Sequence, residues 1–184
     1  MSRSVIKPYH WANTALFYYV LIILVWAPLP LASNRDWSTR LLASLLIGGL
    51  LWSLLLIAFH QLRVWSALRK AWPALTALLA VQVWVGMQLT FNISIEPAST
   101  QLALLFGLAL VAAFFLVLVL VDSQERILTI AQVMVACGVF QAFFAGIAMM
   151  SDLEQVAFLD KIFDRKAASG TFVNRNHLAG FLEM

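Results

Sequence analysis

The sequence predicts an all-α membrane protein, a polytopic helix bundle with five complete transmembrane helices and the start of a sixth. Of 184 residues, 62% are hydrophobic and only 11% are charged, whereas soluble domains average about 45–50% apolar and about 25% charged residues. Mean hydropathy is +0.89. Five apolar runs contain no Lys, Arg, Asp or Glu, and each has the roughly 20 residues that a helix needs to cross a bilayer. They cover residues 14–32, 41–59, 73–91, 102–121 and 127–150.

The runs are interpreted as helices because they lack the two-residue alternation of membrane β-strands. The first run could be taken for a signal peptide, since Arg3 and Lys7 precede it. Its length and its bulky ending, from Trp26 to Pro30, argue against cleavage, which requires a shorter apolar core and small residues. The sequence therefore predicts a retained first span.

Orientation follows from the Lys and Arg residues in the short connections. Six lie on one side (Arg3, Lys7, Arg63, Arg69, Lys70 and Arg126) and two on the other (Arg35 and Arg40). Basic residues concentrate in cytoplasmic loops, so the N-terminus is predicted to be cytoplasmic. Residues 151–176 then lie on the outer face, which is the periplasm for a bacterial inner membrane. Membrane lipids are the expected partners. The net charge of +3 indicates no nucleic-acid partner.

The chain divides into a five-helix region, 1–150, an outer loop, 151–176, and the beginning of a sixth helix, 177–184. Polar residues cluster just before this last segment, where Asn174 or Asn176 is placed to cap the helix. A helix N-terminus with Arg175 beside it, and Arg165 and Lys166 upstream, is suited to binding an anion. The alternative is structural: the asparagine caps the helix and Arg175 anchors at headgroup phosphates.

Two further residues lie near the same predicted helical face. Glu183 follows Asn176 by seven residues, roughly 10 Å along the helix axis, and a carboxylate at that depth calls for a paired or functional role. His177 is counted among the substrate-binding candidates, with a structural role as the alternative. Because Cys137 is the single cysteine, no multi-cysteine metal site is possible, and neither a metal nor a cofactor is expected.

Four segments resemble the O-antigen ligase and polymerase superfamily of bacterial inner-membrane glycan-transfer proteins. The most specific is residues 170–180, GTFVNRNHLAG, which is similar to the start of the family's core domain. The proline-rich end of the first run, residues 28–37, is similar to the family's first exit loop. Residues 93–100 resemble its second outer loop, and residues 141–146 resemble its fifth span.

The resemblance implies a metal-independent transferase that takes a glycan from an undecaprenyl-diphosphate carrier in the periplasm. The acceptor would be a glycolipid, a growing polysaccharide or a protein side chain, and ligase and polymerase are not distinguished. Arg165 and Arg175 would contact the diphosphate, because the guanidinium fork matches phosphate oxygens. Lys166 would support them. The remaining substrate-binding candidates are Asn174, Asn176 and His177.

No residue is assigned as the catalytic base. Family members carry ten or more spans and supply that base from a later loop, so the sequence is expected to be an N-terminal fragment that is inactive alone. The competing hypothesis is a non-enzymatic membrane module, such as a transporter fragment or an assembly partner.

Overall fold

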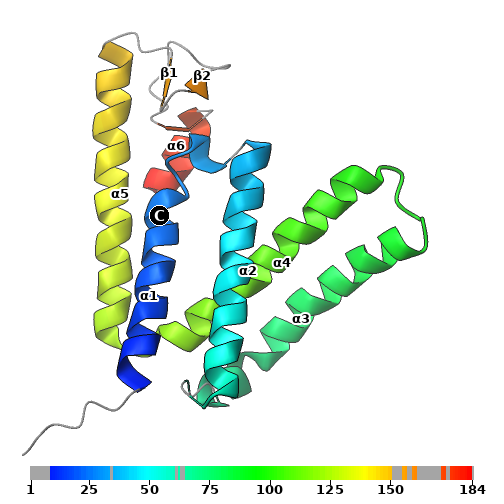
Figure 1. Ribbon diagram of the computed structural model, residues 1–184. Helices are drawn as coiled ribbons and strands as arrows, with labels where there is room; N and C mark the ends of the chain where they lie inside the picture. Colours follow the sequence, from blue (N-terminus) through cyan, green and yellow to red (C-terminus); the bar gives the residue numbers. More distant parts are fainter. Residues whose placement is uncertain are drawn as a thin grey trace, which may run out of the picture. The chain divides into compact units, whose positions relative to one another are not determined.

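The computed structural model describes residues 9–33, 35–60, 62, 65–150, 155–156, 159–160, 171–172 and 175–183. These residues are overwhelmingly helical, as the sequence predicts (Figure 1). One antiparallel pair of two-residue strands, β1 Gln155–Val156 and β2 Leu159–Asp160, is the exception. The helices are α1 Tyr9–Trp26, η1 Leu31–Ser33 (a 3₁₀ turn), α2 Asp36–Ala58, α3 Trp65–Thr90, α4 Pro97–Leu120, α5 Gln124–Met150 and α6 Arg175–Leu182.

Four helices in the described part of the chain are long and apolar enough to cross a membrane: Asp36–Ala58, Leu68–Thr90, Pro97–Leu120 and Gln124–Ile147. At most 33% of the residues in any of their windows are buried inside the protein. At least two thirds of the residues in each window therefore retain some exposed surface. Such surfaces are stable against lipid and costly in water.

The first helix corrects the boundary expected for run 14–32. α1 begins at Tyr9, ends at Trp26 and contains an apolar stretch, Trp11–Trp26, that is shorter than the other four. Its end has a covalent cause: Pro28 and Pro30 donate no backbone hydrogen bond and disfavour helical geometry in the residue before each of them. The chain instead turns, with the Leu29 N–H donating to Trp26 O at 2.9 Å.

The chain forms two compact units, which are described separately. The first comprises Met1–Val20 and Arg40–Ser123. Within it α3 and α4 form a hairpin in which the two helices pack extensively against each other (Figure 1). At the end of α3, Asn92 has a left-handed φ of 54°. The Ile93 N–H donates to Gln88 O at 3.0 Å, and the Asn92 N–H donates to Leu89 O at 3.3 Å. These two hydrogen bonds together form the Schellman motif, which ends many helices.

α4 begins five residues before the apolar run that predicts it. Pro97 occupies the first turn, where a missing N–H costs nothing and the fixed φ suits a helix. The Thr100 hydroxyl is also accommodated, because it donates to Glu96 O at 3.1 Å within that turn. Polar residues that looked like loop in the sequence are therefore part of the helix.

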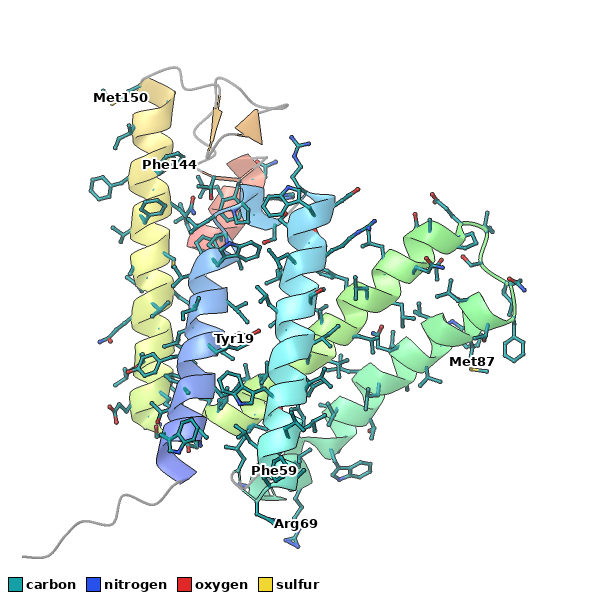
Figure 2. All side chains as sticks on the ribbon, viewed as in Figure 1. Tyr19, Phe59, Arg69, Met87, Phe144 and Met150 are labelled. Atoms are coloured by element: carbon teal, nitrogen blue, oxygen red, sulfur yellow. The ribbon has the colours of Figure 1, made fainter. Side chains whose placement is uncertain are left out.

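Tyr19 joins α1 to α2 within the first unit (Figure 2). Its hydroxyl donates to Leu45 O at 2.8 Å, and its ring meets Trp52 edge to face, with the centroids 5.7 Å apart. Gly49 leaves room for this contact: a Cβ there would lie 3.0 Å from Tyr19 Cε1 and 3.1 Å from Leu116 Cδ1. The two helices therefore approach each other closely at Gly49.

The second unit comprises Leu21–Thr39 and Gln124–Met184. It contains the end of α1, the turn that leads to α2, and α5 with α6 packed on it (Figure 1). α6 begins at Arg175, two residues before the expected boundary of 177. Three of the four segments that carry the family resemblance belong to this unit.

Candidate functional site

A buried polar junction at Thr171 joins three parts of the second unit. Thr171 is 4% exposed and Gln141, on α5, is 0% exposed. The Thr171 backbone N–H donates to Gln141 Oε1 at 3.1 Å. The Thr171 hydroxyl lies 2.5 Å from Pro28 O, just after α1, and 2.9 Å from Gln141 Oε1. One threonine therefore links the end of α1, the middle of α5 and the turn before α6.

The hydroxyl of Thr171 carries one proton, so it can donate fully to only one of its two acceptors. The shorter contact favours Pro28 O, and Gln141 Oε1 then accepts from the Thr171 backbone N–H. The Thr171 N–H fixes the orientation of the Gln141 side-chain amide. If Oε1 and Nε2 exchanged places, the Nε2 donor would face the N–H donor. In the observed orientation Gln141 Nε2 is buried and has no hydrogen-bond partner among the residues that the structure describes, at a typical cost of about 1–3 kcal/mol.

The turn after α1 is strained and strongly hydrogen-bonded. Ala32 and Ser33 both adopt left-handed backbone conformations, with φ of 53° and 55°, each costing roughly 1–2 kcal/mol for a residue with a Cβ. Three side-chain hydroxyls hold the turn in this shape. Ser33 Oγ donates to Ala27 O at 2.7 Å, Thr39 Oγ1 donates to Ser33 O at 2.5 Å, and Ser38 Oγ donates to Arg35 O at 2.9 Å.

α6 is held by a small apolar cluster next to this junction. Phe172 and Leu178 are buried together with Ala145 of α5, and Ala32 and Phe181 pack against them. The Phe172 and Phe181 ring centroids are 5.3 Å apart. Leu178 is turned inward, and the opposite side of the helix is exposed. Asn176 and Glu183 share this side, as their seven-residue spacing predicts. That exposed side carries Asn176, His177, Gly180 and Glu183.

The predicted site residues are only partly described by the structure. Arg165, Lys166 and Asn174 lie outside the described residues, and Arg175 opens α6 without a described side chain. Asn176 and His177 lie in the first turn, both exposed. Because the helix begins at Arg175, Asn176 is inside it and cannot be its N-cap. That alternative was wrong, since a capping side chain must precede the first helical residue.

An apolar groove of about 340 Å³ adjoins the junction. It lies between the end of α1 and α5, and its walls include Val25, Pro28, Leu29, Ala136, Phe140 and Gln141. Its lining is almost entirely hydrocarbon, which suits a lipid chain better than a polar molecule. Within the described part of the chain, no three His, Cys, Asp or Glu side chains come close enough to hold a metal ion.

In the sequence alone, an amide such as Gln141 within an apolar run is expected to serve helix packing, and no motif singles out Thr171 or Ser33. Nothing in the sequence around Thr171 indicates that it contacts Gln141, 30 residues away, and Pro28, 143 residues away. The available signal was indirect: Thr171, Gln141 and Pro28 each lie in a segment of the family resemblance.

The four long apolar helices indicate a helical membrane protein. No family model, no curated protein and no solved structure matches the chain.

Proposed function

We propose that this chain belongs to a bacterial inner-membrane glycan ligase or polymerase of the O-antigen type. In this proposal a glycan leaves an undecaprenyl-diphosphate carrier and joins an acceptor on the periplasmic side. α1 to α5 are five complete spans with the N-terminus in the cytoplasm, and α6 is the start of a sixth. The 18 residues of α1 extend about 27 Å, close to the roughly 30 Å hydrocarbon core.

The observation that carries the proposal is the meeting of three resemblance segments at one residue. Residues 28–37, 141–146 and 170–180 were singled out separately in the sequence. Thr171 is hydrogen-bonded to both Pro28 and Gln141. A shared buried junction gives a physical reason for these segments to occur together, and it supports the resemblance without depending on any single motif.

The position of α6 suits the proposed chemistry. Its N-terminus presents backbone N–H groups, a favourable place for a diphosphate, and Arg175 is its first residue. Asn176 and His177 occupy the exposed first turn, where they can donate hydrogen bonds to a polar head. The adjoining groove of about 340 Å³ offers an apolar surface to the carrier chain. These residues are assigned to binding, with no catalytic base among them.

Binding of undecaprenyl diphosphate to the purified chain in lipid nanodiscs tests this assignment. A charge-assisted hydrogen bond contributes about 1.5–3 kcal/mol, so Arg175→Gln and Arg165→Gln should each weaken the Kd at least about tenfold. Lys70→Gln is the matched control, because Lys70 lies at the predicted cytoplasmic end of α3. Undecaprenol, which lacks the diphosphate, should bind weakly to all forms.

Equal affinity in the arginine variants and in Lys70→Gln would refute the diphosphate site. Absence of any binding to the unaltered chain would favour the rival function, a non-enzymatic membrane module.

The proposed orientation is tested independently by reporter fusions after Ser66 and after Asp160. A cytoplasmic signal at Ser66 and a periplasmic signal at Asp160 are expected. A cytoplasmic signal at Asp160 would place α6 on the wrong side of the membrane for a periplasmic transferase.

A further inference from the structure

The loop between α3 and α4 exposes large apolar side chains on the surface of the first unit. Phe91 is 66% exposed, Ile93 is 64% exposed and Ile95 is 103% exposed, the highest value among the large apolar residues described. Exposed apolar groups that are contiguous usually mark a contact surface. The three residues alternate with polar ones in the six-residue connection 91–96, which forms the tip of the α3–α4 hairpin (Figure 1).

The loop holds this conformation through its own hydrogen bonds. Ser94 Oγ and Thr100 Oγ1 are 2.6 Å apart, and the Ile93 and Ser94 N–H groups both donate to Gln88 O, at 3.0 and 3.3 Å. Ser94 is half-buried. The loop thus turns the Ser94 hydroxyl inward and exposes its two isoleucines beside Asn92 and Glu96, and exposed isoleucine side chains are costly in water.

The lengths of the flanking helices place this tip near the membrane surface. The spans Leu68–Thr90 and Pro97–Leu120 have 23 and 24 residues, or about 35 Å each at about 1.5 Å per residue. The hydrocarbon core is roughly 30 Å thick, and with headgroups about 40–45 Å. Residues 91–96 therefore begin where the hydrocarbon ends, and residues 92–101 contain no Lys or Arg.

We propose that the loop Phe91–Glu96 is a membrane-interface anchor, with Ile93 and Ile95 inserted at the boundary between headgroups and acyl chains. The occupant of this surface is bilayer lipid. A stable protein partner would need about 800 Å² on each side, which three side chains cannot supply. The inference is independent of the proposed function, because the loop belongs to the first unit and the transferase site to the second.

Spin labelling of the full chain in phosphatidylcholine vesicles tests the anchor. The background is Cys137→Ala, which removes the single native cysteine, and the label is attached to Ile95→Cys or, separately, to Ile93→Cys. Ser123→Cys is the matched control, because Ser123 lies in the polar, exposed connection between α4 and α5. Collision of the nitroxide with oxygen, which concentrates in lipid, is compared with collision with a water-soluble nickel chelate.

The oxygen-to-nickel ratio should be several-fold higher at positions 93 and 95 than at 123. A ratio at both positions equal to that at 123 would show that the loop projects into water and would overturn the proposal. Poor access of both reagents would overturn it too, because it would show protein covering the loop. Two labelled positions keep the test decisive if one variant fails to fold.

Discussion

Replacing Thr171 with valine removes one hydroxyl from the buried junction while keeping the shape of the side chain. The variant loses the hydrogen bond that the Thr171 hydroxyl donates to Pro28 O at 2.5 Å. Pro28 O still accepts from the Ala32 N–H at 3.2 Å, and Gln141 Oε1 keeps the Thr171 backbone N–H. Since no partner becomes wholly unsatisfied, the cost is that of one hydrogen bond within a membrane protein, about 0.6–2 kcal/mol.

The free energy of unfolding is measured in detergent micelles by denaturant titration, followed by tryptophan fluorescence. Thr76→Val is the matched control, because the Thr76 hydroxyl is exposed and donates within its own helix to Trp72 O at 2.9 Å. Its effect should stay within about 0.5 kcal/mol. If Thr171→Val were no more destabilising than Thr76→Val, the junction would make no net contribution to stability.

Gln141→Leu tests whether removing the unpartnered Gln141 Nε2 offsets the loss of the acceptor for the Thr171 N–H. It leaves the buried Thr171 N–H without an acceptor but also removes Gln141 Nε2, which has no partner within the described part of the chain. Each unsatisfied group costs about 1–3 kcal/mol, so the two changes nearly cancel and stability should change little. A loss of several kcal/mol would show that Nε2 is satisfied in the folded protein.

Two further predictions concern positions where adding or removing a Cβ should change the free energy of unfolding. At Gly107 a Cβ would lie 2.0 Å from Gln82 Oε1, the end of a flexible side chain that can move aside, so Gly107→Ala should destabilise the α3–α4 hairpin by no more than about 1 kcal/mol. In the Gln82→Ala background the same change should instead stabilise the hairpin by about 0.5–1 kcal/mol, because alanine is the better helix former, and an equal effect in both backgrounds would exclude this contact as a factor. Ala32→Gly should preserve or raise stability by up to about 1 kcal/mol, because glycine adopts a left-handed φ without strain; Ala74→Gly, in an exposed helical position, should lower stability by about 1 kcal/mol. Destabilisation by Ala32→Gly comparable to that by Ala74→Gly would show that the lost packing of Ala32 against the Phe172 and Leu178 cluster outweighs the relief of strain.

The four long spans were predictable from the sequence because hydropathy is a local property. The sequence-based prediction errs at helix ends, in α1 and in α4. The apolar run through Pro28 and Pro30 continues past the helix, which stops at Trp26, whereas α4 starts at Pro97, before its apolar run begins. In both places backbone chemistry, rather than side-chain hydropathy, decides where a helix begins or ends.

The candidate site was predictable only as a set of segments. The sequence indicated that residues 174–177 open a helix and that Asn176 and Glu183 share a face. It could not show that Thr171, three residues before this cluster, is buried against Gln141 and Pro28. Nor could it choose between Asn174 and Asn176 as the N-cap, because that choice depends on a shift of two residues in the helix start.

The sequence by itself determined that this protein is a helical membrane protein, because the free energy of placing about 20 apolar residues in lipid depends on composition and length alone. Only the tertiary structure decided which polar groups satisfy one another. Hydrogen bonds require donor and acceptor within about 3 Å of each other, and a distance between residues 143 positions apart is set by helix packing. The junction at Thr171 is therefore a property of the folded chain, although each of its three segments can be read in the sequence.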